Sequence, residues 1–208
     1  MCSRSISIAA FAAAFAALLF AKPVLGGPPL PGESWADPCI ALCPKGDLIF
    51  HLHGFRNGSP VEAWPVEVDF CAAPGVRLAP TTGAEPYQII LGCRVSVFTG
   101  ADGVGVFAIK AGGVARDVHV EVTSPLVLAV RSAVVSPDQN GDLQVDPSDV
   151  AIAEAKLGSA DPTADLDCDG AVTAADLNLL RDHLGHAAAG PIAVQGKSWQ
   201  GIKGLFRN

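Results

Sequence analysis

Two acidic segments near the C-terminus repeat one pattern, and this repeat constrains the fold more than any other feature. Residues 138–149 and 165–176 align without gaps, and 27 residues separate equivalent positions. Each segment places oxygen-bearing side chains at positions 1, 3, 5 and 12 and a β-branched residue at position 8. A 12-residue calcium loop uses this register and adds a backbone carbonyl at position 7. The repeat therefore predicts two calcium ions, one in each loop.

The predicted ligands follow from the register. For the first ion they are the side chains of Asp138, Asn140, Asp142 and Asp149 and the carbonyl of Gln144. For the second ion they are the side chains of Asp165, Asp167, Asp169 and Asp176 and the carbonyl of Ala171. Position 6 normally needs glycine, and Leu143 there costs about 1–2 kcal/mol in a left-handed conformation. Gly170 occupies position 6 of the second loop, so we expect the second site to bind calcium more tightly.

Each loop precedes a short helical pattern. Apolar residues at helical spacing follow each loop and end in Leu-Gly, at Leu157-Gly158 and Leu184-Gly185, where glycine is typical of a helix stop. No apolar pattern of helix length precedes Asp138. This loop-plus-helix duplication resembles the dockerin family over about residues 136–186. The resemblance implies a small all-α, EF-hand-like domain that docks onto a cohesin-like partner, with a link to extracellular polysaccharide degradation.

The predicted docking surface departs from that family. Dockerins tend to carry hydroxyl residues at loop positions 10 and 11, whereas this chain has Pro147-Ser148 and Ala174-Ala175. We expect the two units to pack with an approximate two-fold axis and to present unlike faces. The expected contact residues are Ser148, Glu154 and Lys156 on the first helix and Ala175, Arg181 and Asp182 on the second.

The N-terminus has the pattern of a secretory signal. Arg4 precedes an unbroken apolar run at residues 8–21, and small residues follow, with cleavage expected after Gly26. The run is short for a membrane span, although a retained anchor is the alternative. We therefore expect no membrane span after cleavage and a location outside the cell or on its surface. Millimolar extracellular calcium would fill even modest sites.

Residues 38–135 alternate apolar and polar side chains in short runs separated by turn signals, which predicts six or seven strands of an antiparallel sandwich. Residues 99–113 resemble bacterial immunoglobulin-like repeats of surface adhesins. The predicted fold class is thus an all-β immunoglobulin-like sandwich plus a small all-α calcium-binding domain. The expected boundaries are a signal at 1–26, a linker at 27–37, the sandwich at 38–135, the dockerin-like domain at 136–187, and a linker with an amphipathic tail at 188–208.

Four cysteines in or beside the predicted sandwich indicate two disulfides, and three pairings are open: Cys39, Cys43, Cys71 and Cys93. A Cys71–Cys93 bond would close a loop and contribute about 3 kcal/mol through chain entropy. Cys39 and Cys43 could then pair with each other, or each could instead pair with one of the later two cysteines. A zinc site of four cysteines is a weaker alternative, because the second close pair is missing. Cys168 is expected to be a free thiol or an intermolecular link.

Charge and motifs restrict the function. The formal net charge is −7, and an acidic surface without a basic stripe excludes nucleic acid as a partner. The sequence has no Gly-x-Ser-x-Gly or His-Glu-x-x-His motif, so we expect no catalytic residues. Four histidines fit structural roles, as exposed strand residues or as cations at a helix C-terminus: His51, His53, His183 and His186.

The most consistent function is that of a secreted, non-catalytic calcium-binding protein that docks onto a cohesin-like or other surface protein. Carbohydrate is a further ligand class to consider. The alternative is a calcium-stabilised structural or adhesive protein of the cell surface or matrix. A small glycoside hydrolase would need a shaped cleft between two carboxylates, and about 95 residues of sandwich leave little room for one.

Overall fold

The computed structural model describes residues 27–188, except 117–119, 125 and 132. The predicted secretory signal and amphipathic tail lie outside the described residues. Among the described residues, no helix is long and apolar enough to cross a membrane.

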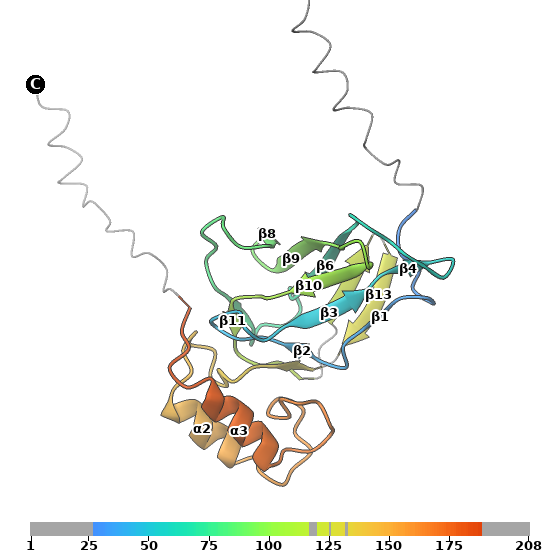
Figure 1. The fold of residues 1–208 in the computed structure, drawn as a ribbon. Helices are drawn as coiled ribbons and strands as arrows, with labels where there is room; N and C mark the ends of the chain where they lie inside the picture. The colour runs from blue at the N-terminus through green and yellow to red at the C-terminus, as the bar shows by residue number, and fades with distance from the viewer. Residues whose placement is uncertain (1–26, 117–119, 125, 132, 189–208) are drawn as a thin grey trace, which may run out of the picture.

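Short strands make up most of the ordered elements (Figure 1). The first half of the chain contains β1 (Trp35–Ala36), β2 (Ile40–Ala41), β3 (Phe50–His53), β4 (Phe55–Arg56), β5 (Ser59–Pro60), β6 (Pro65–Asp69), β7 (Arg77–Leu78), β8 (Gln88–Ile90) and β9 (Arg94–Phe98). The second half contains β10 (Val104–Phe107), β11 (Ala111–Gly112), β12 (Val120–Ser124), β13 (Leu126–Arg131), β14 (Val134–Val135), α2 (Pro147–Glu154) and α3 (Ala174–Asp182).

The strands form one five-stranded sheet and several smaller ones. The largest sheet is antiparallel and has the order β13-β12-β6-β9-β8. A second sheet has the order β1-β3-β10, and β11-β7, β14-β2 and β4-β5 are two-stranded. The β14-β2 pair is parallel, which brings the end of the β region beside its beginning.

The predicted alternation along the strands does identify core residues. Val66 and Val68 on β6 are fully buried, and the neighbouring Glu67 is half-buried. They pack in one cluster with Phe50 of β3 and Phe107 of β10, whose ring centroids lie 5.6 Å apart. Burial of such side chains stabilises the fold by about 1.5–3 kcal/mol each.

The predicted fold class is wrong. The described strands are two to six residues long and are distributed over several small sheets rather than the two packed sheets of an immunoglobulin-like sandwich. The C-terminal part is not an all-α helix-loop-helix domain, because α2 and α3 have only eight and nine residues and loops connect them. The physical reason is that apolar periodicity determines which residues are buried and leaves strand pairing undetermined.

Two disulfides are present, as expected for an oxidising compartment. The Cys71–Cys93 bond, one of the pairings that the sequence left open, is present. The other bond joins Cys39 to Cys168, so the prediction that Cys168 is a free thiol or an intermolecular link is wrong. None of the three pairing schemes for the other four cysteines holds in full. Cys43 is free and buried. Because 129 residues separate Cys39 from Cys168, only the tertiary fold could bring them together.

Candidate functional site

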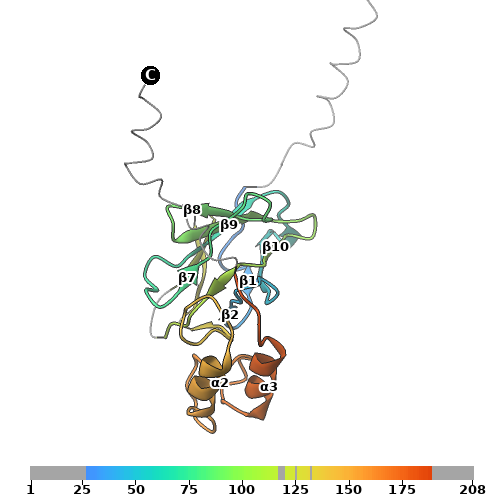
Figure 2. The ribbon, with the colours of Figure 1, turned by 90° about the vertical axis from the view of Figure 1, so that its left-hand side faces the viewer.

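The two acidic loops end in matching helix starts beneath the strands, where α2 and α3 lie side by side (Figure 2). Asp146 caps α2, accepting a hydrogen bond from the Ser148 N–H, and Thr173 caps α3 in the same way. The carboxylates of Asp149 and Asp176 complete each capping box by accepting from the backbone N–H of the cap residue. The carboxylate at position 12 of each predicted calcium loop is therefore held in place by the first turn of the helix that follows the loop.

Carboxylates at the two ends of the first loop organise its backbone. Asp138 is fully buried and accepts hydrogen bonds from the N–H groups of Gly141 at 2.7 Å and Leu143 at 2.8 Å. Asp149 is also fully buried and accepts from Gln139 at 2.8 Å. Each carboxylate oxygen has two lone pairs, so a backbone donor leaves a further position for a cation.

The second loop repeats this arrangement at the same positions. Asp165 accepts from the N–H of Gly170 at 2.8 Å, and Asp176 accepts from Leu166 at 2.6 Å. Ligand oxygens of Asp165, Asp167 and Asp169 all lie within 4.8 Å of one another. The structure thus brings together three of the predicted ligands of the second ion.

Position 7, whose backbone carbonyl is a predicted calcium ligand, is held in the same way in both loops. Gln144 donates its N–H to Asp142 and Ala171 donates its N–H to Asp169, each at 2.9 Å. Both residues are exposed. The side chain of Asn140 accepts from the Asp142 N–H at 2.8 Å, so position 3 also takes part in the turn.

The loop backbones share a left-handed conformation at positions 4 and 6. Position 4 is Gly141 with φ 77° in the first loop and Cys168 with φ 60° in the second. Position 6 is Leu143 with φ 69° and Gly170 with φ 99°. The sequence-based expectation of strain at Leu143 therefore agrees with the geometry, because a β-carbon disfavours this region.

The clustered carboxylates favour a cation. Burial, followed by the charges of Asp149 and Asp142, raises the pKa of Asp138, although backbone donors oppose the shift. Burial likewise raises the pKa of Asp149. In the second loop, desolvation and then the charge of Asp176 raise the pKa of Asp167. The donor set consists of carboxylate, amide and carbonyl oxygens, which hard cations such as Ca²⁺ prefer.

The first loop is packed against the β region. A β-carbon added at Gly112 of β11 would clash with a carboxylate oxygen of Asp138. The Gly113 N–H also donates to the Asp138 carbonyl at 2.9 Å, and Leu143 packs with Ala79 and Ala188. In the sequence, Gly112-Gly113 has the pattern of a turn signal. Two adjacent glycines can also signal a close backbone approach, as they do here.

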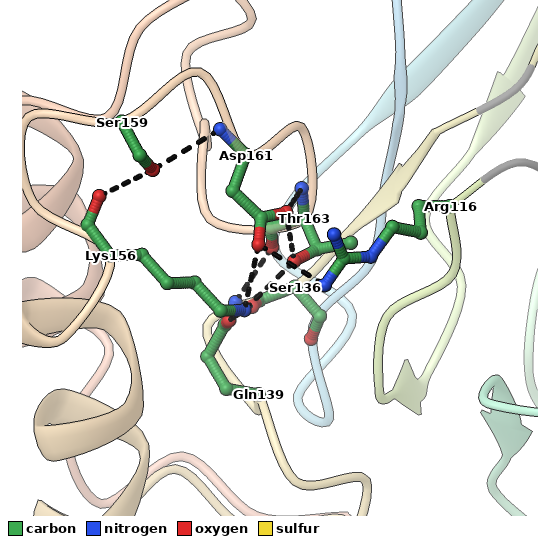
Figure 3. Close-up of polar contacts among 7 residues, drawn as sticks. All are labelled: Arg116, Ser136, Gln139, Lys156, Ser159, Asp161 and Thr163. Atoms are coloured by element: carbon green, nitrogen blue, oxygen red, sulfur yellow. Dashed lines mark hydrogen bonds and ion pairs between the residues drawn. The ribbon is translucent and has the colours of Figure 1, made fainter.

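A second connection involves the segment between the helices (Figure 3). The Lys156 ammonium donates to Gln139 at 3.0 Å and to Thr163 at 2.8 Å. Asp161 accepts from Thr163 and pairs with Arg116 of the β region at 3.3 Å. Lys156 was predicted to be exposed, but its side chain is partly buried, because its ammonium bonds to Gln139 and Thr163.

Hydrogen bonds show an internal two-fold relation between the loop–helix units. Val145, at position 8 of the first loop, accepts from Gly185 and donates to His186 after α3. Val172, at position 8 of the second loop, accepts from Gly158 and donates to Ser159 after α2. These four bonds measure 2.8–2.9 Å. Each loop thus pairs with the segment that follows the other helix.

The helices show the same relation. Glu154 and Arg181 occupy equivalent repeat positions and form an exposed ion pair at 2.7 Å. The two predicted contact faces are therefore adjacent, and the Glu154–Arg181 ion pair connects them. Leu157 and Leu184, also equivalent, are exposed at the ends of the units.

Comparisons of this chain with protein-family models, with curated proteins and with solved structures find no match. The assignment of the site therefore depends on its residues and geometry.

Proposed function

We propose that this protein is an exported, non-catalytic calcium-binding protein whose duplicated loop–helix segment docks onto another protein. The observation that carries the proposal is the identical hydrogen-bond register of the two acidic loops. In both, the position 1 carboxylate accepts from the position 6 N–H, and the position 12 carboxylate accepts from the position 2 N–H. Such loops preorganise oxygen ligands around one site.

The proposed docking surface consists of the exposed sides of α2 and α3 and of the turns that follow them. The equivalent Leu157 and Leu184 are 52% and 43% exposed, and the Glu154–Arg181 pair lies on the same two-helix unit. The resemblance to dockerins suggests a cohesin-like partner and a link to extracellular polysaccharide degradation. Ser148 bonds to Asp146 and Asn140 within its own loop, so the surface lacks a matched pair of free hydroxyls. We therefore propose one productive docking orientation.

A structural role at the cell surface or in the matrix is the second candidate. The buried contact between Asp138 and Gly112 and the Cys39–Cys168 bond fasten both loops to the β region. Calcium bound there would stiffen the connection between the two parts. The two disulfides fit export to an oxidising compartment in either case.

Calcium binding is tested first by isothermal titration calorimetry of the oxidised protein. We expect two calcium equivalents for the wild type and one for Asp176→Ala. The matched control is Asp182→Ala, which removes an exposed carboxylate from the same helix and should leave two. An unchanged stoichiometry in Asp176→Ala would contradict the assignment of the second loop.

Docking is tested by calcium-dependent capture from the secreted fraction of the source cells, with identification of the retained proteins. The docking function predicts a cohesin-like partner that is retained with calcium and released by a chelator. Leu157→Ser/Leu184→Ser should abolish capture while calcium stoichiometry remains two. Failure of any protein to bind in a calcium-dependent way would favour the structural role.

A further inference from the structure

A second cluster of metal-ligating side chains lies outside the calcium loops. Cys43, Asp47, His183 and His186 each contribute an atom, and these four atoms lie within 4.8 Å of one another. Cys43 and Asp47 follow β2, whereas the histidines follow α3, where the chain turns back toward the strands (Figure 1). The cluster therefore joins two parts of the fold that are far apart in sequence.

The separations match a tetrahedral ligand shell. The Cys43 Sγ lies 3.7 Å from His186 Nδ1, and that nitrogen lies 3.2 Å from an Asp47 carboxylate oxygen. His183 Nε2 lies 3.9 Å from the other Asp47 oxygen. Ligands bound to zinc at 2.0–2.3 Å in a tetrahedron are separated by roughly 3.3–3.8 Å. Small side-chain movements would thus complete the shell.

The surroundings of the histidines favour metal binding. His183 Nδ1 lies 2.7 Å from the Leu179 carbonyl, so it carries the proton and leaves Nε2 free as a ligand. One thiolate, one carboxylate and two neutral imidazoles would balance the charge of Zn²⁺. The donor set of sulfur, nitrogen and oxygen suits zinc and differs from the all-oxygen set of the calcium loops.

Comparison of the two repeat units shows that the turn after the helix can form without histidines. The residues equivalent to His183 and His186 in the first unit are Lys156 and Ser159. There Lys156 forms two hydrogen bonds, to Gln139 and Thr163, and an ion pair with Asp161. The second unit instead aims two imidazoles at a cysteine and an aspartate.

We infer that Cys43, Asp47, His183 and His186 form a structural zinc site that fastens the end of α3 to the β region. Binding replaces the Cys43 S–H bond with a sulfur–zinc bond and releases the proton to solvent. Four protein ligands leave no open position for catalysis.

Lys45 competes with a cation for this cluster. Its ammonium lies 3.4 Å from an Asp47 oxygen and 3.5 Å from His186 Nε2, but the side chain is 60% exposed. It can turn outward when a metal binds. Replacing it with methionine should therefore strengthen zinc binding.

The test is a zinc titration of the oxidised full chain in saturating calcium, by competition with a chromophoric chelator. We expect one zinc equivalent for the wild type. Asp47→Asn and His183→Gln should each weaken binding by at least the roughly 10- to 100-fold that loss of an outer-shell partner causes. Lys45→Met should bind more tightly. The matched control is His51→Gln/His53→Gln, a histidine pair on β3, which should bind zinc as the wild type does.

Cobalt provides a readout of the sulfur ligand. The Co²⁺-loaded wild type should show thiolate-to-metal charge-transfer absorption, and Cys43→Ser should lose it. Because Cys43 is buried, Cys43→Ser could misfold, and circular dichroism would detect this. In that case the zinc titrations of Asp47→Asn and His183→Gln test the inference. Absence of zinc binding in the wild type, or equal binding in these two variants, would overturn the inference.

Discussion

At the scale of single residues, close approaches and buried charges fix the relation between the loops and the strands. Asp138 lies against Gly112, and the space between them is too small for one additional carbon atom. The Glu85 carboxylate is a buried charge: its side chain is 3% exposed, and it pairs with the Lys110 ammonium at 3.1 Å. Each of these residues supports a prediction.

Gly112→Ala should displace the Asp138 carboxylate and weaken calcium binding in the first loop. Overpacking of this kind costs typically about 1–3 kcal/mol of folding stability. Calorimetry and denaturant unfolding measure the two effects. Gly32→Ala is the control, because a β-carbon there meets no atom within 4 Å. Wild-type affinity and stability in Gly112→Ala would show that the contact is not required.

Glu85→Gln should remove a pH-dependent part of stability. Desolvation alone would raise the pKa of Glu85, but hydrogen bonds from Lys110 and then Thr82 and nearby backbone lower it from 4.5 to about 2. A lowered folded-state pKa stabilises the protein above about pH 4.5, and this contribution disappears as the pH falls toward 2.

The measurement is the free energy of unfolding of wild type and Glu85→Gln against pH. The difference between them should be constant above about pH 5.5 and should shrink below pH 4.5. Glu62→Gln, at an exposed position, controls for loss of charge. A difference that stays constant down to pH 2 would contradict the assignment.

At the scale of elements, the two loops share a backbone path but differ in their supports. Leu143 combines an unfavourable φ of 69° with burial beside Ala79 and Ala188. Loss of a buried leucine side chain costs about 2–5 kcal/mol, which exceeds the roughly 1–2 kcal/mol of backbone strain. Packing therefore explains why a leucine is tolerated where glycine would be unstrained.

Leu143→Ala and Leu143→Gly separate packing from strain. Both should destabilise the protein, because both remove the buried side chain. The glycine variant should be the more stable of the two by up to about 1 kcal/mol, because relief of strain outweighs the added entropy of the unfolded chain. Denaturant unfolding in saturating calcium measures both. A glycine variant less stable than the alanine variant would mean that the left-handed backbone is not strained.

Local pattern predicted the local elements. The spacing of Asp138 to Asp149 and of Asp165 to Asp176 located both loops, and the Leu-Gly pairs located the ends of both helical units within a few residues. Alternation identified Val66 and Val68 as core residues. These features depend on neighbours in the chain, which a single sequence displays.

Long-range pairings were beyond a single sequence. The pairing of β14 with β2, the Cys39–Cys168 bond and the cluster around Cys43 each join segments more than 90 residues apart. Many alternative pairings bury the same apolar residues, so periodicity cannot choose among them. The wrong fold class and the wrong cysteine assignments share this cause.

At the scale of the whole molecule, the apolar residues of the strands and those of the loop–helix units form separate clusters, which suggests two steps of unfolding. A third, small cluster joins Ala79 of the β region to Leu143 and Ala188. The larger cluster runs from Ala36 to Val134 and contains the buried residues of the strands. The smaller one contains Val145, Ala153, Leu177 and Leu180 of the loop–helix units. A four-residue cluster is small, so cation binding should supply much of the stability of this part.

Removal of calcium should therefore unfold residues 136–188 while the strands stay folded. Hydrogen exchange measured by mass spectrometry, with calcium or with a chelator, should show loss of amide protection in α2 and α3 and retention in β6 and β9. The contact between Asp138 and Gly112 predicts some added exchange at β11. Equal protection of α2 and α3 in both conditions would contradict a role for calcium in folding.

In the two loop–helix units, each loop forms its backbone hydrogen bonds with the segment after the other unit's helix, which makes the two copies depend on each other. Val145 bonds to the segment after α3 and Val172 to the segment after α2, so each half of the repeat is completed by the other. A single loop–helix unit, expressed alone, would have an unpaired edge at position 8 and should associate with a second copy as a symmetric dimer. Fusion of two such copies into one chain makes that association independent of concentration. Once fused, neither copy can be deleted without exposing the edge of the survivor, whereas side chains at the contact can diverge into complementary pairs, as Glu154 and Arg181 have.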